Sequence, residues 1–163
     1  MNYIVGDIGN TSIRICLLND KFLIIKSTIF ETQKAFKKSF FKKNIKNFFK
    51  QPISKKILFS SVVPKAYKEI KKNLEKLKFD VIEIKELKVK KIIKINIKKL
   101  SQLGSDRIVN AIGGKKIKNC LIIDFGTATT FDIIKNGIYE GGVIAPGISS
   151  SIKNLSQSTA LLP

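Results

Sequence analysis

The chain has 163 residues, 44% of them hydrophobic, and its 31 lysines and arginines against 12 acidic residues give a net charge of +19. This length is enough for one domain or two small ones with packed cores, and the sequence shows neither an apolar run long enough to span a bilayer nor a signal peptide. We therefore expect a soluble cytoplasmic protein that does not bind membranes. Because the chain contains no histidine, any general base has to be a carboxylate, a lysine, a tyrosine or a cysteine.

The positive charge is carried almost entirely by lysine, since Arg14 and Arg107 are the two arginines of the sequence. A strongly basic chain can bind nucleic acid. Scattered lysine, however, lacks the bidentate fork with which arginine binds phosphate and guanine. Nucleic-acid binding is therefore the least favoured hypothesis. Cys16 and Cys120 lie in apolar runs without metal-ligand spacing and are expected to be free, buried thiols.

The first part of the chain has the pattern of an α/β unit. Apolar and β-branched residues predict strands over 3–7, 12–18 and 22–28, with a turn at Asn19-Asp20. A helix over 32–49, a strand over 56–60, a helix over 64–77 that begins at Pro64 and a strand over 80–84 follow. The lysine-rich segment 85–100 is expected to be a connector with a short strand, and 105–113 a helix.

The opening pattern then returns. Strands are predicted over 120–124, 129–134 and 138–144, and a helix over 148–155. Aligning Asp7 with Asp124, an offset of 117 (124 − 7), brings Thr11 onto Ala128 and Asn19 onto Asn136 without a gap. We interpret this as an internal duplication. It predicts one domain over 1–117 and a second over 118–163, which is expected to be incomplete because the later strands and helices of the first copy are not repeated.

Two loops of the duplicated pattern carry the same polar chemistry, an acid that ends a strand followed by glycine and by amide or hydroxyl side chains. In DIGNTSIR (7–14), backbone N–H groups with Asn10, Thr11 and Ser12 can donate to phosphate oxygens, and Asp7 can hold Mg²⁺. DFGTATTF (124–131) offers hydroxyls such as that of Thr127 in the same way. Two such loops facing each other can hold one nucleoside triphosphate, although a plain polar hairpin is the alternative for each.

A third motif, GSDR (104–107), precedes the helix predicted over 105–113. Asp106 can accept the proton of a substrate hydroxyl, since phosphoryl transfer needs one carboxylate base at the acceptor, or it can simply cap the helix. Arg107 can bind an anionic acceptor in a bidentate fork, pair with Asp106 or lie on a solvated helix face. A fourth motif, GGVIAPGISSS (141–151), is a glycine-rich turn before a helix N-terminus, which suits anions.

With these motifs in this order, the sequence resembles the type III pantothenate kinase family, in the superfamily that includes acetate kinase, sugar kinases and actin. The resemblance is carried by DIGNT (7–11), LGSDRIVNA (103–111), IIDFGTATTFD (122–132), GGVIAPGI (141–148) and TALLP (159–163). It implies a duplicated ribonuclease H-like fold of the actin-like ATPase type and ATP-dependent phosphorylation of pantothenate, the first step of coenzyme A biosynthesis. It also implies Mg²⁺, a monovalent cation such as K⁺ or NH₄⁺, and a homodimer.

The resemblance assigns roles to individual residues. The monovalent-cation aspartate of the family matches Asp124, and a nucleotide contact matches Thr127. The proton acceptor matches Asp106, within a pantothenate loop that falls on Gly104, Ser105, Asp106 and Arg107. The ATP loop falls on Asp7, Ile8, Gly9, Asn10, Thr11, Ser12, Ile13 and Arg14.

The sequence departs from the family at one substrate position. Ile97 stands where the family usually carries a substrate-contacting tyrosine, and an isoleucine side chain cannot donate a hydrogen bond. The family also continues beyond TALLP, where it carries a substrate-contacting threonine. Two functions therefore remain open: a pantothenate kinase, or a non-catalytic remnant that binds nucleotide only.

Overall fold

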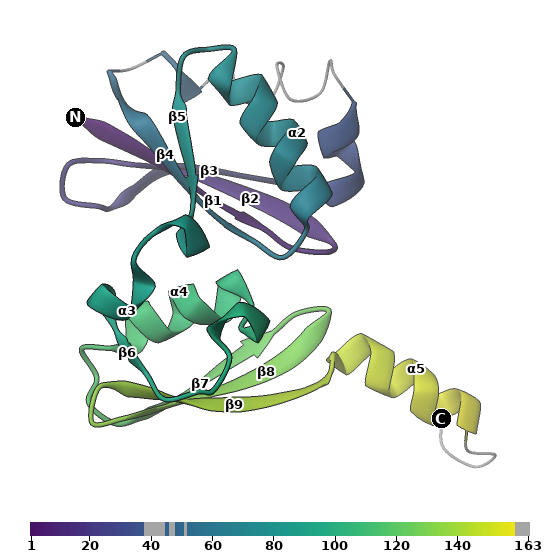
Figure 1. The fold of residues 1–163 in the computed structure, drawn as a ribbon. Helices are drawn as coiled ribbons and strands as arrows, with labels where there is room; N and C mark the ends of the chain where they lie inside the picture. Colours follow the sequence, from purple (N-terminus) through teal and green to yellow (C-terminus); the bar gives the residue numbers. More distant parts are fainter. Residues whose placement is uncertain (38–44, 46–47, 51, 159–163) are drawn as a thin grey trace. The chain divides into compact units, whose positions relative to one another are not determined.

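The computed structural model of the chain describes residues 1–37, 45, 48–50 and 52–158. The chain divides into two compact units, Met1–Leu87 (unit 1) and Lys88–Pro163 (unit 2), each built on its own sheet (Figure 1). Both units combine a sheet with helices, so the predicted α/β class is confirmed. No helix in this described part is both long and apolar enough to cross a bilayer.

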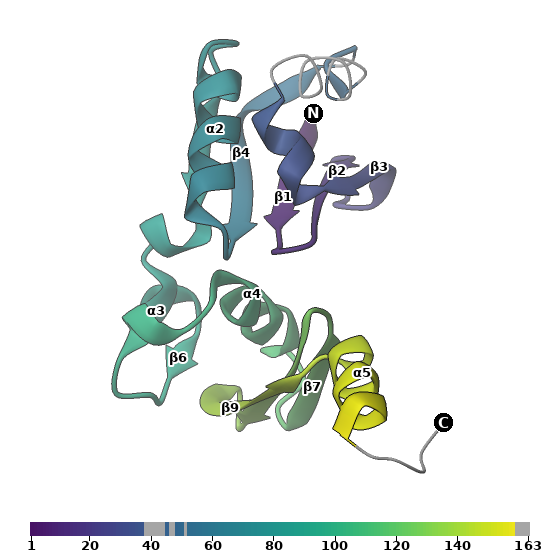
Figure 2. The same ribbon diagram turned by 90° about the vertical axis from the view of Figure 1, so that its right-hand side faces the viewer.

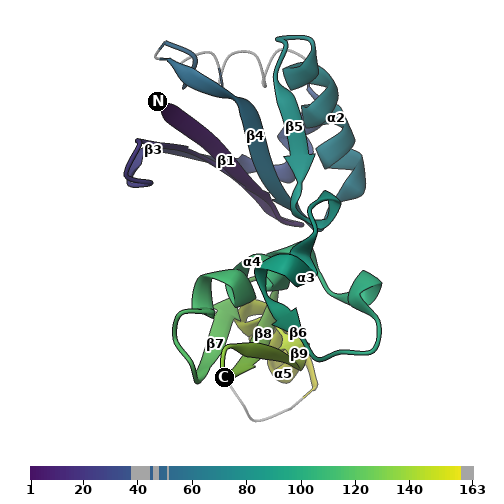
Figure 3. The same ribbon diagram turned by 60° about the vertical axis from the view of Figure 1, so that its left-hand side comes forward.

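Unit 1 has a five-stranded sheet in the order β3-β2-β1-β4-β5. The first three strands are antiparallel neighbours, and β4 and β5 add to β1 in parallel, side by side in Figure 3. Each of the five strands overlaps a strand predicted from the apolar pattern. Their bounds are β1 (Asn2–Ile8), β2 (Ser12–Leu18), β3 (Ile24–Glu31), β4 (Ile53–Ser61) and β5 (Asp80–Glu83).

Helix α2 (Pro64–Glu75) begins at the predicted proline and packs its apolar stripe into the core of unit 1. Ala66, Ile70 and Leu74 are buried there with the inward side chains of β1 and β2. The 3₁₀ helix η1 (Thr32–Phe36) contributes Ala35 to the same core and lies beside α2 (Figure 2). The sheet and these helices therefore share one apolar layer.

Three predicted elements of unit 1 differ from the structure. The helix predicted to 77 ends at Glu75, because the chain leaves the helix at Lys78, whose φ is +63°. The third strand starts at Ile24 because Phe22 has a φ of +60° in a turn that the Asn19 side chain caps, accepting from the N–H of Leu23 at 2.9 Å. Within the helix predicted over 32–49, residues 32–36 form the 3₁₀ helix η1, and residues 38–44 and 46–47 lie outside the described residues.

Unit 2 has a four-stranded sheet in the order β6-β9-β8-β7, with helix α4 packed on one face of β7 and β8 (Figure 1). A tight turn at Asn136 and Gly137, with φ values of +51° and +73°, joins β8 and β9 as the sequence predicts. Five of its elements bear on the site: β6 (Lys94–Ile95), α4 (Ser105–Gly114), β7 (Cys120–Phe125), β8 (Ala128–Lys135) and β9 (Ile138–Pro146). The remaining described helices of the segment after β5 are η3 (Ile84–Glu86), α3 (Val89–Ile92), η4 (Leu100–Gln102) and α5 (Ile148–Ser158).

Packing groups residues 88–117 with the second sheet, because α4 lies against β7 and β8. The predicted domain boundary at residue 117 assigns the same segment to the first domain. That boundary stays a prediction about the duplicated halves, whereas the compact units divide at Leu87.

The internal duplication is visible in the two hairpins, but its alignment needs one gap. Ile8 pairs with Ile13 across residues 9–12, whereas Phe125 pairs with Thr129 across residues 126–128. The second loop is therefore one residue shorter, and the ungapped alignment of Thr11 with Ala128 is wrong. Strand register places Thr127 in the position of Thr11.

Candidate functional site

The loop between β1 and β2 presents polar side chains around a closed backbone turn. The N–H of Gly9 donates to the carbonyl of Ser12 at 2.9 Å. Asp7 and Arg14 are cross-strand partners at the mouth of the turn, and both are exposed. Asn10, Thr11 and Ser12 are exposed as well, whereas Ile8 and Ile13 are fully buried and can offer a ligand their backbone groups alone.

Thr32, at the start of η1, holds the backbone of this loop through two hydrogen bonds. Its hydroxyl donates to the carbonyl of Gly9 at 2.6 Å and its N–H donates to the carbonyl of Thr11 at 3.0 Å. Thr32 therefore supports the backbone of this loop, beside which the side chains of residues 10–12 are exposed. The sequence offered one signal for this role, a threonine at the predicted start of the helix over 32–49.

The loop between β7 and β8 is held in the equivalent way by the start of α5. The N–H of Gly126 donates to the carbonyl of Ala128 at 3.0 Å, and the N–H of Gly147 donates to the carbonyl of Thr127 at 3.2 Å. A Cβ atom at Gly147 would lie 2.4 Å from the carbonyl oxygen of Gly126. Gly147, in the fourth motif, is therefore the residue that lets the loop approach α5 this closely.

Asp106 lies in the first turn of α4, one residue after its start, and its carboxylate is half-buried. Its Oδ1 accepts from the backbone N–H of Arg107 at 2.8 Å. The N-cap of α4 is Gly104, which has no capping side chain. Asp106 thus stabilises the helix start locally and still presents a carboxylate at that end of the helix.

Asn110 on α4 contacts Asp124 on β7. It lies one helical turn after Asp106 on the same face of α4, and its side-chain amide donates to Oδ2 of Asp124 at 3.3 Å. The structure therefore brings these two predicted carboxylates to one side of α4. Sequence reasoning missed Asn110, although the spacing of four residues from Asp106 was a signal.

A buried ion pair lies between α4 and the sheet, and it was not predicted. Nε of Arg107 donates to Oδ1 of Asp132 on β8 at 2.7 Å, and the hydroxyl of Tyr139 on β9 donates to the same oxygen at 2.7 Å. Burial, followed by the hydrogen bond to Asp132, raises the pKa of the Tyr139 phenol above its usual range, with Arg107 acting in the opposite direction. The acid inside the otherwise apolar strand pattern of 129–134 was the available sequence signal.

The remaining predicted residues occupy the same unit. Ser105 is buried and Gly104 is half-buried at the start of α4, while Thr127 is exposed in its loop. Ile97 is half-buried, with its Cγ2 3.5 Å from the place where a Cβ atom of Gly141 would lie. TALLP (159–163) lies outside the described residues.

Asp124 and its cross-strand partner Thr130 are residues that could hold a cation. Within the described residues, no group of three or more histidine, cysteine, aspartate or glutamate side chains gathers as a metal site. Thr130, the cross-strand partner of Asp124, has a buried hydroxyl without a hydrogen-bond partner among the described residues. One carboxylate together with hydroxyl and carbonyl oxygens is a ligand set that K⁺ accepts.

Comparison with known sequences points to one family. A family model described as type III pantothenate kinase matches residues 3–163. The type III pantothenate kinase of Pelagibacter ubique is 45% identical over 166 residues, which cover 98% of this chain and 65% of that protein. The chain thus spans slightly less than two thirds of the length of this relative.

Solved structures share the fold. A conserved protein of Campylobacter jejuni, described as a Baf family transcriptional activator, is 25% identical with a TM-score of 0.55, over 98% of this chain and 62% of that one. A Sinorhizobium meliloti protein described as a 2-dehydro-3-deoxygalactonokinase has a TM-score of 0.59 at 12% identity, over 98% of this chain and 58% of that one. These similarities, together with the two sheets, confirm the duplicated ribonuclease H-like fold predicted from the sequence.

Proposed function

Because the chain belongs to the type III pantothenate kinase family, we propose that it transfers the γ-phosphoryl group of ATP to the hydroxyl of pantothenate, giving 4'-phosphopantothenate. The observation that carries this proposal is the family match over residues 3–163, within which all four polar motifs keep their order. This reaction is the first step of coenzyme A biosynthesis. The same proposal includes a cytoplasmic location and action as a homodimer, as expected from the sequence and its family resemblance.

We assign ATP to the loop over residues 7–14 and to Thr127. The exposed side chains of Asn10, Thr11, Ser12 and Arg14 supply donors and positive charge for the phosphate oxygens, while Ile8 and Ile13 contribute their backbone. Asp7 would hold Mg²⁺, and Asp124 with Thr130 would hold K⁺ or NH₄⁺. When bound, these cations would neutralise the charge that develops on the transferred phosphoryl group.

We assign the proton-accepting role to Asp106. It lies in the first turn of α4, directly after Gly104 and Ser105, to which we assign pantothenate together with Ile97. One carboxylate oxygen accepts from the N–H of Arg107, which fixes the orientation of the group. The other carboxylate oxygen accepts the proton of the pantothenate hydroxyl while the hydroxyl oxygen attacks the γ-phosphorus of ATP.

The test is a phosphorylation assay with ATP, K⁺ and pantothenate, run on the wild type and on Asp106→Asn. We expect turnover in the wild type that is lost by a factor of about 10²–10⁴ in the variant, the usual contribution of a positioned base. Equal activity in the two proteins would contradict the assignment of Asp106.

The second candidate is nucleotide binding without turnover. The observation that favours it is the apolar Ile97 at the position to which the resemblance assigns a substrate contact. Saturable ATP binding by calorimetry, with no product under the assay conditions above, would support this alternative. The matched variant Ile97→Tyr separates the two, since restored turnover in it would identify the missing substrate contact.

A further inference from the structure

Arg107 is one of two arginines in a chain otherwise charged by lysine, and its side chain points into unit 2. Its side chain is 11% exposed and that of Asp132 is fully buried. Nε and Nη2 of Arg107 both lie 2.7 Å from Oδ1 of Asp132, although Nη2 does not have hydrogen-bond geometry. A buried carboxylate without such a partner would be strongly destabilising, so Arg107 cannot leave Asp132 at little cost.

Tyr139 completes the arrangement from the neighbouring strand. Its hydroxyl donates to the same Oδ1 at 2.7 Å, and the side chain is fully buried. Oδ2 of Asp132 has no hydrogen-bond partner among the described residues. The stabilisation of this carboxylate therefore depends on the donors that α4 and β9 bring to its other oxygen.

Gly142 on β9 lies close to both the neighbouring strand β8 and the guanidinium of Arg107. A Cβ atom at this position would lie 2.6 Å from Nη2 of Arg107 and 1.8 Å from the carbonyl oxygen of Phe131. The backbone of Phe131 is the closest obstacle, and the end of the Arg107 side chain lies on the same side. The second glycine of the GGVIAPGI motif is thus required by the neighbouring strand, and it also leaves room for the guanidinium of Arg107.

The same arginine also contacts Asp106 through its backbone. The N–H of Arg107 donates to Oδ1 of Asp106 at 2.8 Å, while its side chain is fixed to β8. The orientation of the Asp106 carboxylate is therefore tied to the sheet through one residue, in the first turn of α4.

We propose that Arg107, Asp132 and Tyr139 form a positioning network that holds the first turn of α4 on the sheet and thereby fixes the carboxylate of Asp106. The inference rests on the proposed function for the role of Asp106, while the anchoring of α4 can be tested without any reaction. In this network Arg107 acts through its neighbours. Binding of an anionic acceptor by its guanidinium would require breaking the buried pair with Asp132.

The first measurement is hydrogen exchange of the backbone amides of residues 105–110. In Tyr139→Phe and in Asp132→Asn we expect these amides to exchange at least about tenfold faster than in the wild type, because local opening of the turn becomes easier. Tyr67→Phe is the matched control, since Tyr67 in unit 1 also donates its hydroxyl to a carboxylate, that of Glu86, at 3.0 Å. Unchanged exchange at 105–110 in both network variants would overturn the proposal.

The second measurement separates positioning from plain stability. We expect kcat to fall about 10- to 100-fold in Tyr139→Phe and Asp132→Asn, with KM for pantothenate changed less than about threefold, because a misplaced base loses turnover before binding. Tyr67→Phe should keep both constants. The triple variant Arg107→Met/Asp132→Leu/Tyr139→Phe replaces the buried charges by apolar groups, which is often neutral for stability.

The triple variant decides between the two roles. If its melting temperature returns to the wild-type value while kcat stays low, the network positions Asp106. If stability and kcat recover together, the network is merely structural and the proposal is overturned. A wild type without kinase activity but with faster exchange in the network variants would refute the proposed function and support the anchoring of α4.

Discussion

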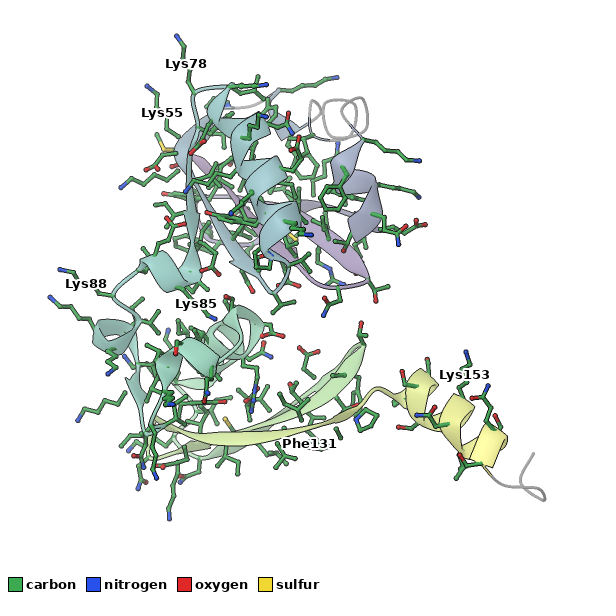
Figure 4. All side chains as sticks on the ribbon, turned by 45° about the vertical axis from the view of Figure 1, so that its right-hand side comes forward. Lys55, Lys78, Lys85, Lys88, Phe131 and Lys153 are labelled. Atoms are coloured by element: carbon green, nitrogen blue, oxygen red, sulfur yellow. The ribbon has the colours of Figure 1, made fainter. Side chains whose placement is uncertain are left out.

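The two duplicated hairpins carry apolar side chains on the same face, but among the described residues a helix covers this face in unit 1 and none covers it in unit 2. In unit 1, Ile8 and Ile13 are fully buried in a core that they share with α2. In unit 2, Phe125 takes the place of Ile8 and is 66% exposed. The same face of the second sheet also exposes Leu121, Ile123, Ile133 and Val143, beside Phe131, which is labelled in Figure 4.

This difference shows that the face of a sheet on which a side chain lies does not by itself determine whether the side chain is buried. Strand alternation decides which side chains share a face, whereas burial depends on a helix that packs there. In unit 2 the helix α4 covers the opposite face, which carries Asp132 and Ile134. The buried ion pair of unit 2 therefore lies on the face of the sheet that α4 covers. In unit 1, the polar side chains of Asp7 and Arg14 lie on the face away from α2.

The largest effect expected from this comparison is on core truncation. Ile8→Ala should lower the free energy of unfolding of unit 1 by about 2–5 kcal/mol, because it removes a fully buried side chain and leaves a cavity. The matched variant Phe125→Ala, at the equivalent position of unit 2, should change stability by no more than about 0.5 kcal/mol, because that side chain is mostly in water.

Hydrogen exchange followed unit by unit measures both changes, since each unit has its own sheet. A loss of stability in Phe125→Ala as large as that in Ile8→Ala would show that the exposed face of unit 2 is covered in solution.

The second prediction concerns Gly6, which stands where unit 2 has Ile123. A Cβ atom at Gly6 would lie 2.1 Å from the Phe59 ring, which fills this part of the unit 1 core. Gly6→Ala should therefore destabilise unit 1 by about 1–3 kcal/mol through overpacking. Denaturant unfolding checks this, with Ile123→Ala as a control expected to cost less than about 1 kcal/mol at its half-exposed position.

A second-site change tests the cause. Phe59→Leu shortens the ring that meets the new methyl group, so it should cost less in the Gly6→Ala background than alone. Additive effects of the two changes would contradict the steric explanation.

Much of the fold follows from local pattern, and the site follows in part. The strands of both hairpins and the start of α2 at Pro64 could be predicted because apolar spacing and proline act within a few residues. The positive φ of Phe22 could not, because a large aromatic residue rarely adopts it.

The polar motifs identified the residues of the candidate site but not their partners. The ion pair of Arg107 with Asp132 joins residues 25 positions apart, and the close approach of Gly142 to Arg107 depends on how α4 packs across the sheet. Such contacts are set by tertiary packing, which one sequence does not reveal. Charge, by contrast, is a surface property here, and lysines such as Lys55 and Lys78 point outward from the ribbon (Figure 4).

The smallest expected effect compares the two buried phenols, Tyr67 in unit 1 and Tyr139 in unit 2, at high pH. Burial, and then a hydrogen bond to Glu86 or Asp132 respectively, raises the pKa of each above the ordinary value of 10.0. A raised pKa means that the folded state keeps its proton to a higher pH than the unfolded state. The stabilisation is therefore complete below pH 10 and is lost as the pH rises towards the folded pKa.

The wild type should therefore lose stability above pH 10 more steeply than either Tyr→Phe variant, by at most about 1.4 kcal/mol per pH unit for the fully buried Tyr139. For Tyr67 the difference should be smaller, because its partner Glu86 is half-exposed. Denaturant unfolding between pH 9 and pH 11 measures both differences against the same lysine background, and equal slopes in the wild type and Tyr139→Phe would show that the phenol of unit 2 is not held by Asp132.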